Sequence, residues 1–201
     1  MVHTNSWKVQ QAGAEHAARI VALFERADVP CFCQYYQFDG DHRNWQDRCA
    51  NDQLANREGL VADLSSGRIW GVTALLDDGE EAAIGWARVA PAGQLSKLYD
   101  NRLYRNLSVL REGERARTFA MSCFLVDPRF RKLGVARSLL QAAITMAQEH
   151  GALSVEAFPR GANDVSDAEQ WLGPRELYEE LGFERVVDFA PYPVYRLQLP
   201  R

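Results

Sequence analysis

The residues best suited to chemistry lie in a short basic turn between positions 127 and 137. Arg129, Arg131, Lys132 and Arg137 are four cations within nine residues of a chain whose formal net charge is −4. Gly134 lies among them and allows the backbone to approach a ligand without a side chain in the way. A helix that begins here adds N–H groups without internal partners and the positive end of its dipole. These features predict an anion site, and phosphate is the anion that such helix ends usually bind.

The patterns on either side of the turn predict the elements that position it. Residues 118–126 form a near-continuous apolar run, which is typical of a strand in the middle of a covered sheet. From Val135 to His150, apolar residues recur at helical spacing, and Gly151 follows at the expected end. The turn therefore joins a buried strand to an amphipathic helix. We expect its main chain to hold most of a phosphate-bearing ligand.

This turn resembles the acyl-CoA turn of the GNAT superfamily of N-acetyltransferases, which has the pattern Arg/Gln-x-x-Gly-x-Gly/Ala. Here the pattern reads Arg131-Lys132-Leu133-Gly134-Val135-Ala136. The alternative is an ordinary surface turn whose arginines serve solubility. A second segment, Leu177-Tyr178-Glu179-Glu180-Leu181-Gly182-Phe183, is similar to the late helix of that superfamily, whose tyrosine lies near the cofactor sulfur. The resemblance covers most of residues 5–200 and is strongest over 118–187.

Further segments resemble a poorly characterised bacterial GNAT subgroup with an N-terminal Cys-x-Cys pair. They are Cys31-Phe32-Cys33, Asn56-Arg57, Gly85-Trp86, Ser122-Cys123-Phe124 and Glu156-Ala157-Phe158-Pro159. The chain also departs from the superfamily, which commonly has an Asn and an Ala before its Leu-Tyr pair. Trp171 and Pro174 occupy those positions. The contact that the Asn makes with the cofactor's arm is therefore in question.

The resemblance implies an N-acetyltransferase that moves an acetyl group from acetyl-CoA directly to a primary amine of a small molecule or peptide. Acetyl-CoA is the implied co-substrate, and no metal is expected. The implied cofactor contacts are the N–H groups of Phe124, Leu125 and Val126 for the amide-bearing arm. For the diphosphate they are Arg131, Lys132, Leu133, Gly134, Val135, Ala136 and Arg137. The alternative is a non-catalytic module that senses acetyl-CoA or binds a protein partner.

Two side chains are candidates for proton transfer. Acyl transfer from a thioester to an amine requires loss of an amine proton and protonation of the leaving thiolate. Tyr178 is the candidate general acid, and its alternative role is that of a core aromatic. Glu156 is the candidate base, and its alternative role is that of a salt-bridged carboxylate. Cys123 as a nucleophile would need a neighbouring base, and no histidine flanks it.

Composition narrows the classes of partner and compartment. The chain has no uninterrupted apolar stretch of membrane length and no secretory leader, so we expect a cytoplasmic protein without a membrane partner. Its acidic balance argues against nucleic acid. A disulfide framework is not expected in the cytoplasm. Cys31, Cys33, His42 and Cys49 form an alternative zinc set, although the tight Cys-x-Cys pair does not match the spacing of zinc knuckles.

The remaining patterns predict one α+β (mixed α/β) domain over residues 1–201, with a GNAT-like, mostly antiparallel mixed sheet flanked by helices. Expected strands cover 7–10, 69–76, 82–90, 154–159, 183–189 and 194–199, and expected helices cover 14–27 and 174–181. Residues 31–38 are a strand or a pocket-lining loop. Residues 41–56 are helical in part, and a helical turn is expected at 59–64. An Asp-Gly turn at 77–80 indicates a hairpin.

Acceptor specificity is expected to lie in residues 31–58 and 91–117. The long connection from 91 to 115 suggests a functional loop over the site. Candidate lining residues of an aromatic acceptor pocket are Cys31, Tyr35, Tyr36, Trp45, Trp70 and Trp86, and their alternative is the core. A homodimer could form through the terminal strands.

Overall fold

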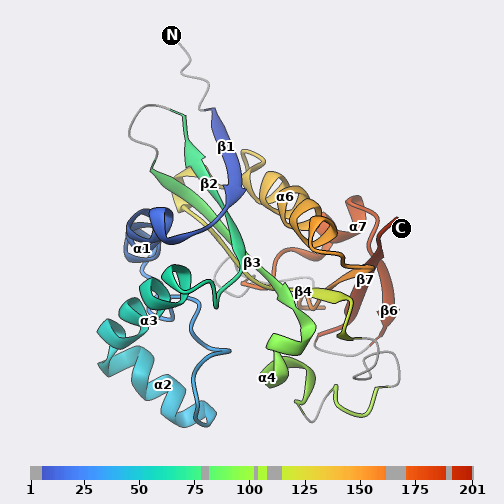
Figure 1. Cartoon of the computed structure of the whole chain (residues 1–201), viewed down its shortest axis with the longest axis horizontal. Coiled ribbons are helices and arrows are strands. Elements are labelled where there is room, and N and C mark those ends of the chain that lie inside the picture. The colour runs from blue at the N-terminus through green and yellow to red at the C-terminus, as the bar shows by residue number, and fades with distance from the viewer. Residues whose placement is uncertain are drawn as a thin grey trace. The chain divides into compact units, whose positions relative to one another are not determined.

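The computed structural model describes residues 6–77, 82–101, 104–107, 115–161, 171–188 and 192–200. Its strands are β1 (Trp7–Gln11), β2 (Gly71–Leu76), β3 (Ala83–Pro91), β4 (Thr118–Val126), β5 (Ser154–Ala157), β6 (Glu184–Val187) and β7 (Val194–Gln198). Its α-helices are α1 (Ala17–Arg26), α2 (His42–Asn51), α3 (Gln53–Ser65), α4 (Ser96–Tyr99), α6 (Val135–Glu149) and α7 (Arg175–Glu180). Short 3-10 helices are η1 (Ala14–His16), η2 (Ala92–Gln94) and η4 (Pro128–Phe130). Figure 1 labels the strands and the α-helices.

The strands form one sheet in the order β1-β2-β3-β4-β5-β7-β6. β1 pairs antiparallel with β2, and β7 pairs antiparallel with both β5 and β6. β4 and β5 run parallel, with Thr118–Ala120 opposite Ser154–Glu156. The predicted mixed, mostly antiparallel sheet is therefore confirmed. No helix in the described ranges has the length and apolar character needed to cross a membrane.

The chain divides into two compact units. Unit 1 contains Met1–Trp86 and Leu125–Ala142, and unit 2 contains Ala87–Phe124 and Ala143–Arg201. β3, β4 and α6 each contribute residues to both units. The single domain expected over residues 1–201 stays a prediction.

In unit 1, three helices pack in series, with α1 against α3 and α3 against α2 (Figure 1). α1 buries one apolar stripe: Ala17, Ile20, Val21, Leu23 and Phe24. The segment after α1 forms turns rather than a strand, and Phe32 stacks on Phe24 with ring centroids 5.5 Å apart. Buried Asn56 donates to the Pro30 carbonyl at 3.0 Å and accepts from Arg48 Nε at 2.7 Å. Asn56 thus ties this segment to both α2 and α3.

Unit 2 contains the end of β3, most of β4 and all of β5, β6 and β7. It also contains α4, α7 and the end of α6. Buried Phe158 makes ring contacts with Tyr99 and Tyr104, with centroids 5.6 and 5.2 Å apart. Thr118 and Ser154 share a buried hydroxyl–hydroxyl bond of 3.0 Å across the parallel pair. These contacts fix β4 and β5, which carry several of the predicted site residues.

Most predicted elements are present, with one substantial difference in residues 41–65. That region holds two helices, α2 and α3, which are separated at Asp52. α2 has no buried residue, so it lacks the apolar stripe that marks a helix in sequence. Residues 78–80 of the hairpin turn expected at 77–80, and the strand end expected at 189, lie outside the described residues.

Candidate functional site

The connection between β4 and α6 presents its main chain to solvent. Lys132, Leu133 and Gly134 are all exposed, and 52% of Leu133 is accessible. Lys132 and Gly134 have φ angles of 59° and 96°, which place the turn in the left-handed region. A Cβ at position 134 would meet no atom of the described residues beyond its own neighbours in the chain within 4 Å. Gly134 therefore faces open space, as the sequence pattern predicts for a backbone that approaches a ligand.

The start of α6 supplies donors next to this open space. Ser138 N–H donates to the Gly134 carbonyl at 3.1 Å, so Gly134 is the residue that begins the helix's hydrogen-bond ladder. The N–H groups of Val135 and Ala136 precede that bond, and helix geometry gives them no acceptor within the helix. Together with the helix dipole they form a surface suited to an anion. The residues present thus fit a phosphate group held by main chain.

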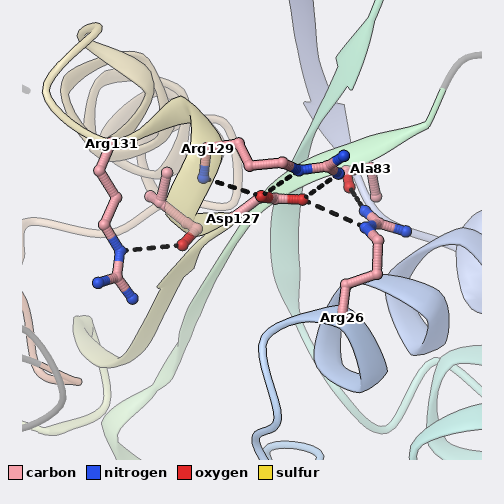
Figure 2. Close-up of polar contacts among 6 residues, drawn as sticks. Arg26, Ala83, Asp127, Arg129 and Arg131 are labelled. Atoms are coloured by element: carbon pink, nitrogen blue, oxygen red, sulfur yellow. Dashed lines mark hydrogen bonds and ion pairs between the residues drawn. The ribbon is translucent and has the colours of Figure 1, made fainter.

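The cations of the turn do not all serve the same purpose. Arg129 is bound to Asp127 by its own N–H at 3.0 Å and by Nε and Nη2 at 3.0 and 2.8 Å. Arg131 Nε donates to the Val126 carbonyl at 3.4 Å, and its guanidinium points away from Asp127 (Figure 2). By accepting from the Arg129 N–H, the Asp127 side chain caps η4, as a turn-forming aspartate does.

Asp127 is also the acceptor for a residue that the sequence analysis did not select. Arg26, the last residue of α1, donates from Nε to Asp127 Oδ2 at 3.2 Å and from Nη2 to the Ala83 carbonyl at 2.5 Å. Asp127 is 1% exposed. Hydrogen bonds from Arg129, with those from Arg26, lower the pKa of the Asp127 carboxyl to about 2. The carboxylate is therefore ionised at neutral pH.

The predicted contacts to the cofactor's arm lie at the end of β4. The Phe124 N–H donates to the Trp171 carbonyl at 2.7 Å, within unit 2. Leu125 and Val126 are the last two residues of the strand, buried and half-buried respectively. Trp171, which stands where the superfamily commonly has Asn, thus uses its main chain at this strand. The roles of Phe124, Leu125 and Val126 in binding stay predictions.

Tyr178 is buried in unit 2 with its hydroxyl bound to main chain. Its side chain is 0% exposed, and the hydroxyl donates to the Leu172 carbonyl at 2.6 Å. Its ring contacts Phe124 and Phe183 edge-on, with centroids 6.3 and 5.1 Å apart. Burial raises the pKa of the phenol well above 10, and nearby Cys123 adds to the effect. Tyr178 is therefore a protonated donor, and its role as general acid stays a prediction.

Glu156 is engaged on both carboxylate oxygens. Arg196, its cross-strand partner on β7, donates to Oε1 from Nε at 2.9 Å and from Nη2 at 2.5 Å. Tyr99 of α4 donates to Oε2 at 2.5 Å. Glu156 is 1% exposed. The sequence left a base and a salt-bridged carboxylate as alternatives, and these contacts support the second. Neither Tyr99 nor Arg196 was selected from the sequence.

The aromatic residues that are candidates to line an acceptor pocket differ in burial. Trp86 is fully buried, whereas Tyr35, Tyr36, Trp45 and Trp70 are half-buried. Tyr35 contacts both Tyr36 and Trp45 edge-on, with centroids 5.2 and 5.5 Å apart. These rings attach the otherwise exposed α2 to the preceding turns.

The cysteines of unit 1 lie in and around the same region. Burial raises the pKa of the Cys31 thiol to about 12, and the nearby Cys33 adds to this effect. Cys49 accepts a 3.8 Å contact from the Asn56 amide. Within the described ranges, no three His, Cys, Asp or Glu side chains are placed to hold a metal ion.

Comparison with known proteins gives a family match. The family model described as "Acetyltransferase (GNAT) family" matches residues 24–183, which is most of the chain. No curated protein matches the sequence.

Solved structures give the same fold at low identity. PaiA N-acetyltransferase from Thermoplasma acidophilum, in complex with coenzyme A, is 11% identical with a TM-score of 0.56, over 96% of this chain and 99% of that one. An N-acetyltransferase from Staphylococcus aureus Mu50 is 16% identical with a TM-score of 0.56, over 97% and 99%. The putative acetyltransferase yncA from Salmonella typhimurium, with its cofactor acetyl-CoA, is 17% identical with a TM-score of 0.54, over 98% and 95%. At these identities the likeness concerns the fold.

Proposed function

The chain belongs to the GNAT family of acetyltransferases, and on that premise we propose that it transfers an acetyl group from acetyl-CoA directly to a primary amine of a small molecule or peptide. The observation that carries this proposal is the open turn at residues 131–136, where a helix start faces space beside an exposed glycine. The coenzyme A and acetyl-CoA in two of the similar structures support the choice of ligand.

The turn would hold the diphosphate of CoA mainly through backbone N–H groups. A phosphate at a helix start accepts hydrogen bonds from the N–H groups that the helix leaves without acceptors, and the dipole favours its charge. Lys132 and Arg137 are exposed on the same turn and add full positive charges. Binding of this kind would keep the thioester end of the ligand within reach of the turn, at most one length of the CoA arm away. Positioning of both reactants supplies much of the acceleration in such a transfer.

When bound, acetyl-CoA supplies the thioester that is attacked by the amine. We assign Tyr178 as the donor of the proton that the leaving thiolate needs. Its hydroxyl would turn from the Leu172 carbonyl toward the sulfur, and its raised pKa keeps it protonated at neutral pH. For the amine proton, Glu156 remains the candidate selected from sequence. Arg196 makes Glu156 a poor proton acceptor, because a hydrogen-bonded arginine stabilises the charged form of a carboxylate.

Thiol release from acetyl-CoA, measured against a panel of primary amines, tests the proposed activity. We expect at least one amine to accelerate release, and we expect Tyr178→Phe to lower kcat by about 10²-fold, which is typical for loss of a general acid. Acetyl-CoA affinity in this variant should be unchanged by calorimetry. Tyr195→Phe is the matched control, because its hydroxyl donates to Glu179 elsewhere in unit 2. Tight acetyl-CoA binding without turnover on any amine would favour the non-catalytic sensor.

A further inference from the structure

The carboxylate of Asp127 joins three segments of unit 1 that are far apart in sequence. Arg26, at the end of α1, and Arg129, in η4, both donate hydrogen bonds to this carboxylate (Figure 2). The backbone of Asp127 contacts the start of β3, where its N–H donates to the Ile84 carbonyl at 2.9 Å. Arg26 also binds that strand through the Ala83 carbonyl. Asp127 and Arg129 lie immediately before residues 131–136, the turn that is proposed to hold the diphosphate.

We propose that Asp127, with Arg26, is a positioning residue that fixes the β4–α6 turn in its ligand-binding shape before the ligand arrives. This inference rests on the proposed function, since it assumes that the turn binds acetyl-CoA. Neither residue touches the ligand in this account. They act by holding η4, from which the main chain leads into the positive-φ residues Lys132 and Gly134.

The need for such a device follows from the conformation of the turn. Lys132 adopts a left-handed φ of 59°, which costs free energy for a residue with a side chain. A strained conformation persists only when the surrounding contacts determine it strongly. The contacts of Asp127 provide this because its side chain is 2% exposed and accepts bonds from two guanidinium groups. Hydrogen bonds to charged groups are the stronger ones in proteins.

The charge of Asp127 has a second effect on the same turn. Arg129 is 67% exposed, but its Nε and Nη2 are directed at Asp127 and not at the start of α6. The pairing leaves the recognition of an anion to the main chain and to the cations at 132 and 137. A turn held in this way pays less entropy on binding than one that orders only with ligand.

Two test variants, at Asp127 and Arg26, and one control variant at Glu25 test this inference. Asp127→Asn keeps an oxygen for the Arg129 N–H but removes the charge that binds both guanidinium groups. Arg26→Gln removes the contact from α1 and leaves the turn sequence intact. Glu25→Gln is the matched control, because Glu25 pairs at 3.0 Å with Arg57 on α3 and not with Asp127.

The readouts are the calorimetric Kd for acetyl-CoA and kcat/KM for two acetyl donors. We expect both test variants to weaken acetyl-CoA binding about tenfold, which corresponds to one charge-assisted hydrogen bond. Saturated kcat should be unchanged. S-acetyl-pantetheine lacks the diphosphate, so its kcat/KM should be unchanged as well. Glu25→Gln should behave as the wild type with both donors.

Three results would overturn the inference. Wild-type affinity for acetyl-CoA in both folded test variants would show that the turn keeps its shape without Asp127 and Arg26. An equal loss of kcat/KM with both donors would indicate general damage to the fold. Absence of acetyl-CoA binding by the wild-type protein would instead contradict the proposed function, and the inference with it. If Asp127→Asn does not fold, Arg26→Gln alone decides between the first two results and the expected one.

Discussion

Glu156 lies between an arginine and a tyrosine, with both of its oxygens accepting hydrogen bonds. Such a buried pair is costly to break, because removal of one partner leaves the other charge without compensation. The Glu156 carboxylate holds Arg196 against β5 and α4 against the same strand. Its position beside the predicted cofactor strand is what made it a candidate base in the sequence. The contacts suggest that its main contribution is to hold unit 2 together.

We therefore expect Glu156→Gln to act on stability more than on chemistry. The free energy of unfolding, measured by urea denaturation, should fall by about 3 kcal/mol because Arg196 loses its buried counter-charge. At a temperature where the variant is folded, kcat should stay within about tenfold of the wild type. Glu179→Gln is the control, since its carboxylate is half-exposed, accepts from the Tyr195 hydroxyl at 2.8 Å and lies 3.8 Å from Arg175 Nε. A larger loss of kcat with unchanged stability would instead identify Glu156 as the base.

The contact between α6 and β3 sets where the N-terminus of α6 lies in unit 1. Gly85 permits this contact, because a Cβ at position 85 would lie 2.8 Å from Val135 Cγ1 and 2.9 Å from Leu139 Cδ1. Val135 and Leu139 are both fully buried in the first turns of the helix. The β-branched Val135 has little freedom to move aside. The N–H groups proposed to bind the diphosphate are therefore placed by a packing contact as well as by the turn.

Gly85→Ala should displace the start of α6 from β3. Overpacking of this kind typically costs about 1–3 kcal/mol, and we expect a loss of unfolding free energy in that range. The KM for acetyl-CoA should rise in parallel, because the helix start moves relative to the turn. Gly93→Ala provides the comparison, since a Cβ at position 93 meets no described atom within 4 Å. Equal stability and equal KM for the two variants would contradict this account of α6.

β4 and α6 were predictable from the sequence because one buries a continuous apolar run and the other a periodic apolar stripe. β4 has the predicted bounds, and α6 ends one residue before the predicted position. α2 was predicted only as partly helical, because it buries no residue and so shows no periodic stripe. Its capping residues were the available signal. Asp41 accepts from the Asn44 N–H at 2.8 Å and Asp52 accepts from the Ala55 N–H at 3.3 Å, as N-caps do.

Over the whole chain, the contacts that organise the candidate site join residues distant in sequence. Arg26 and Asp127 are 101 positions apart, and Tyr99 and Glu156 are 57 positions apart. No local pattern connects such pairs, so the sequence indicated the turn and its helix but not what holds them. The basic turn, in contrast, could be recognised from the sequence alone. It concentrates positive charge in a chain that is negative overall, and its residues are consecutive.

Hydrogen exchange of the full-length protein, read by mass spectrometry over residues 131–137, tests most directly whether these N–H groups bind the diphosphate. With saturating acetyl-CoA, we predict slower exchange in this segment, because its amides acquire phosphate acceptors. With S-acetyl-pantetheine, which has no diphosphate, exchange there should match that of the protein alone. Unchanged exchange over 131–137 at an acetyl-CoA concentration shown by calorimetry to saturate the protein would contradict the account.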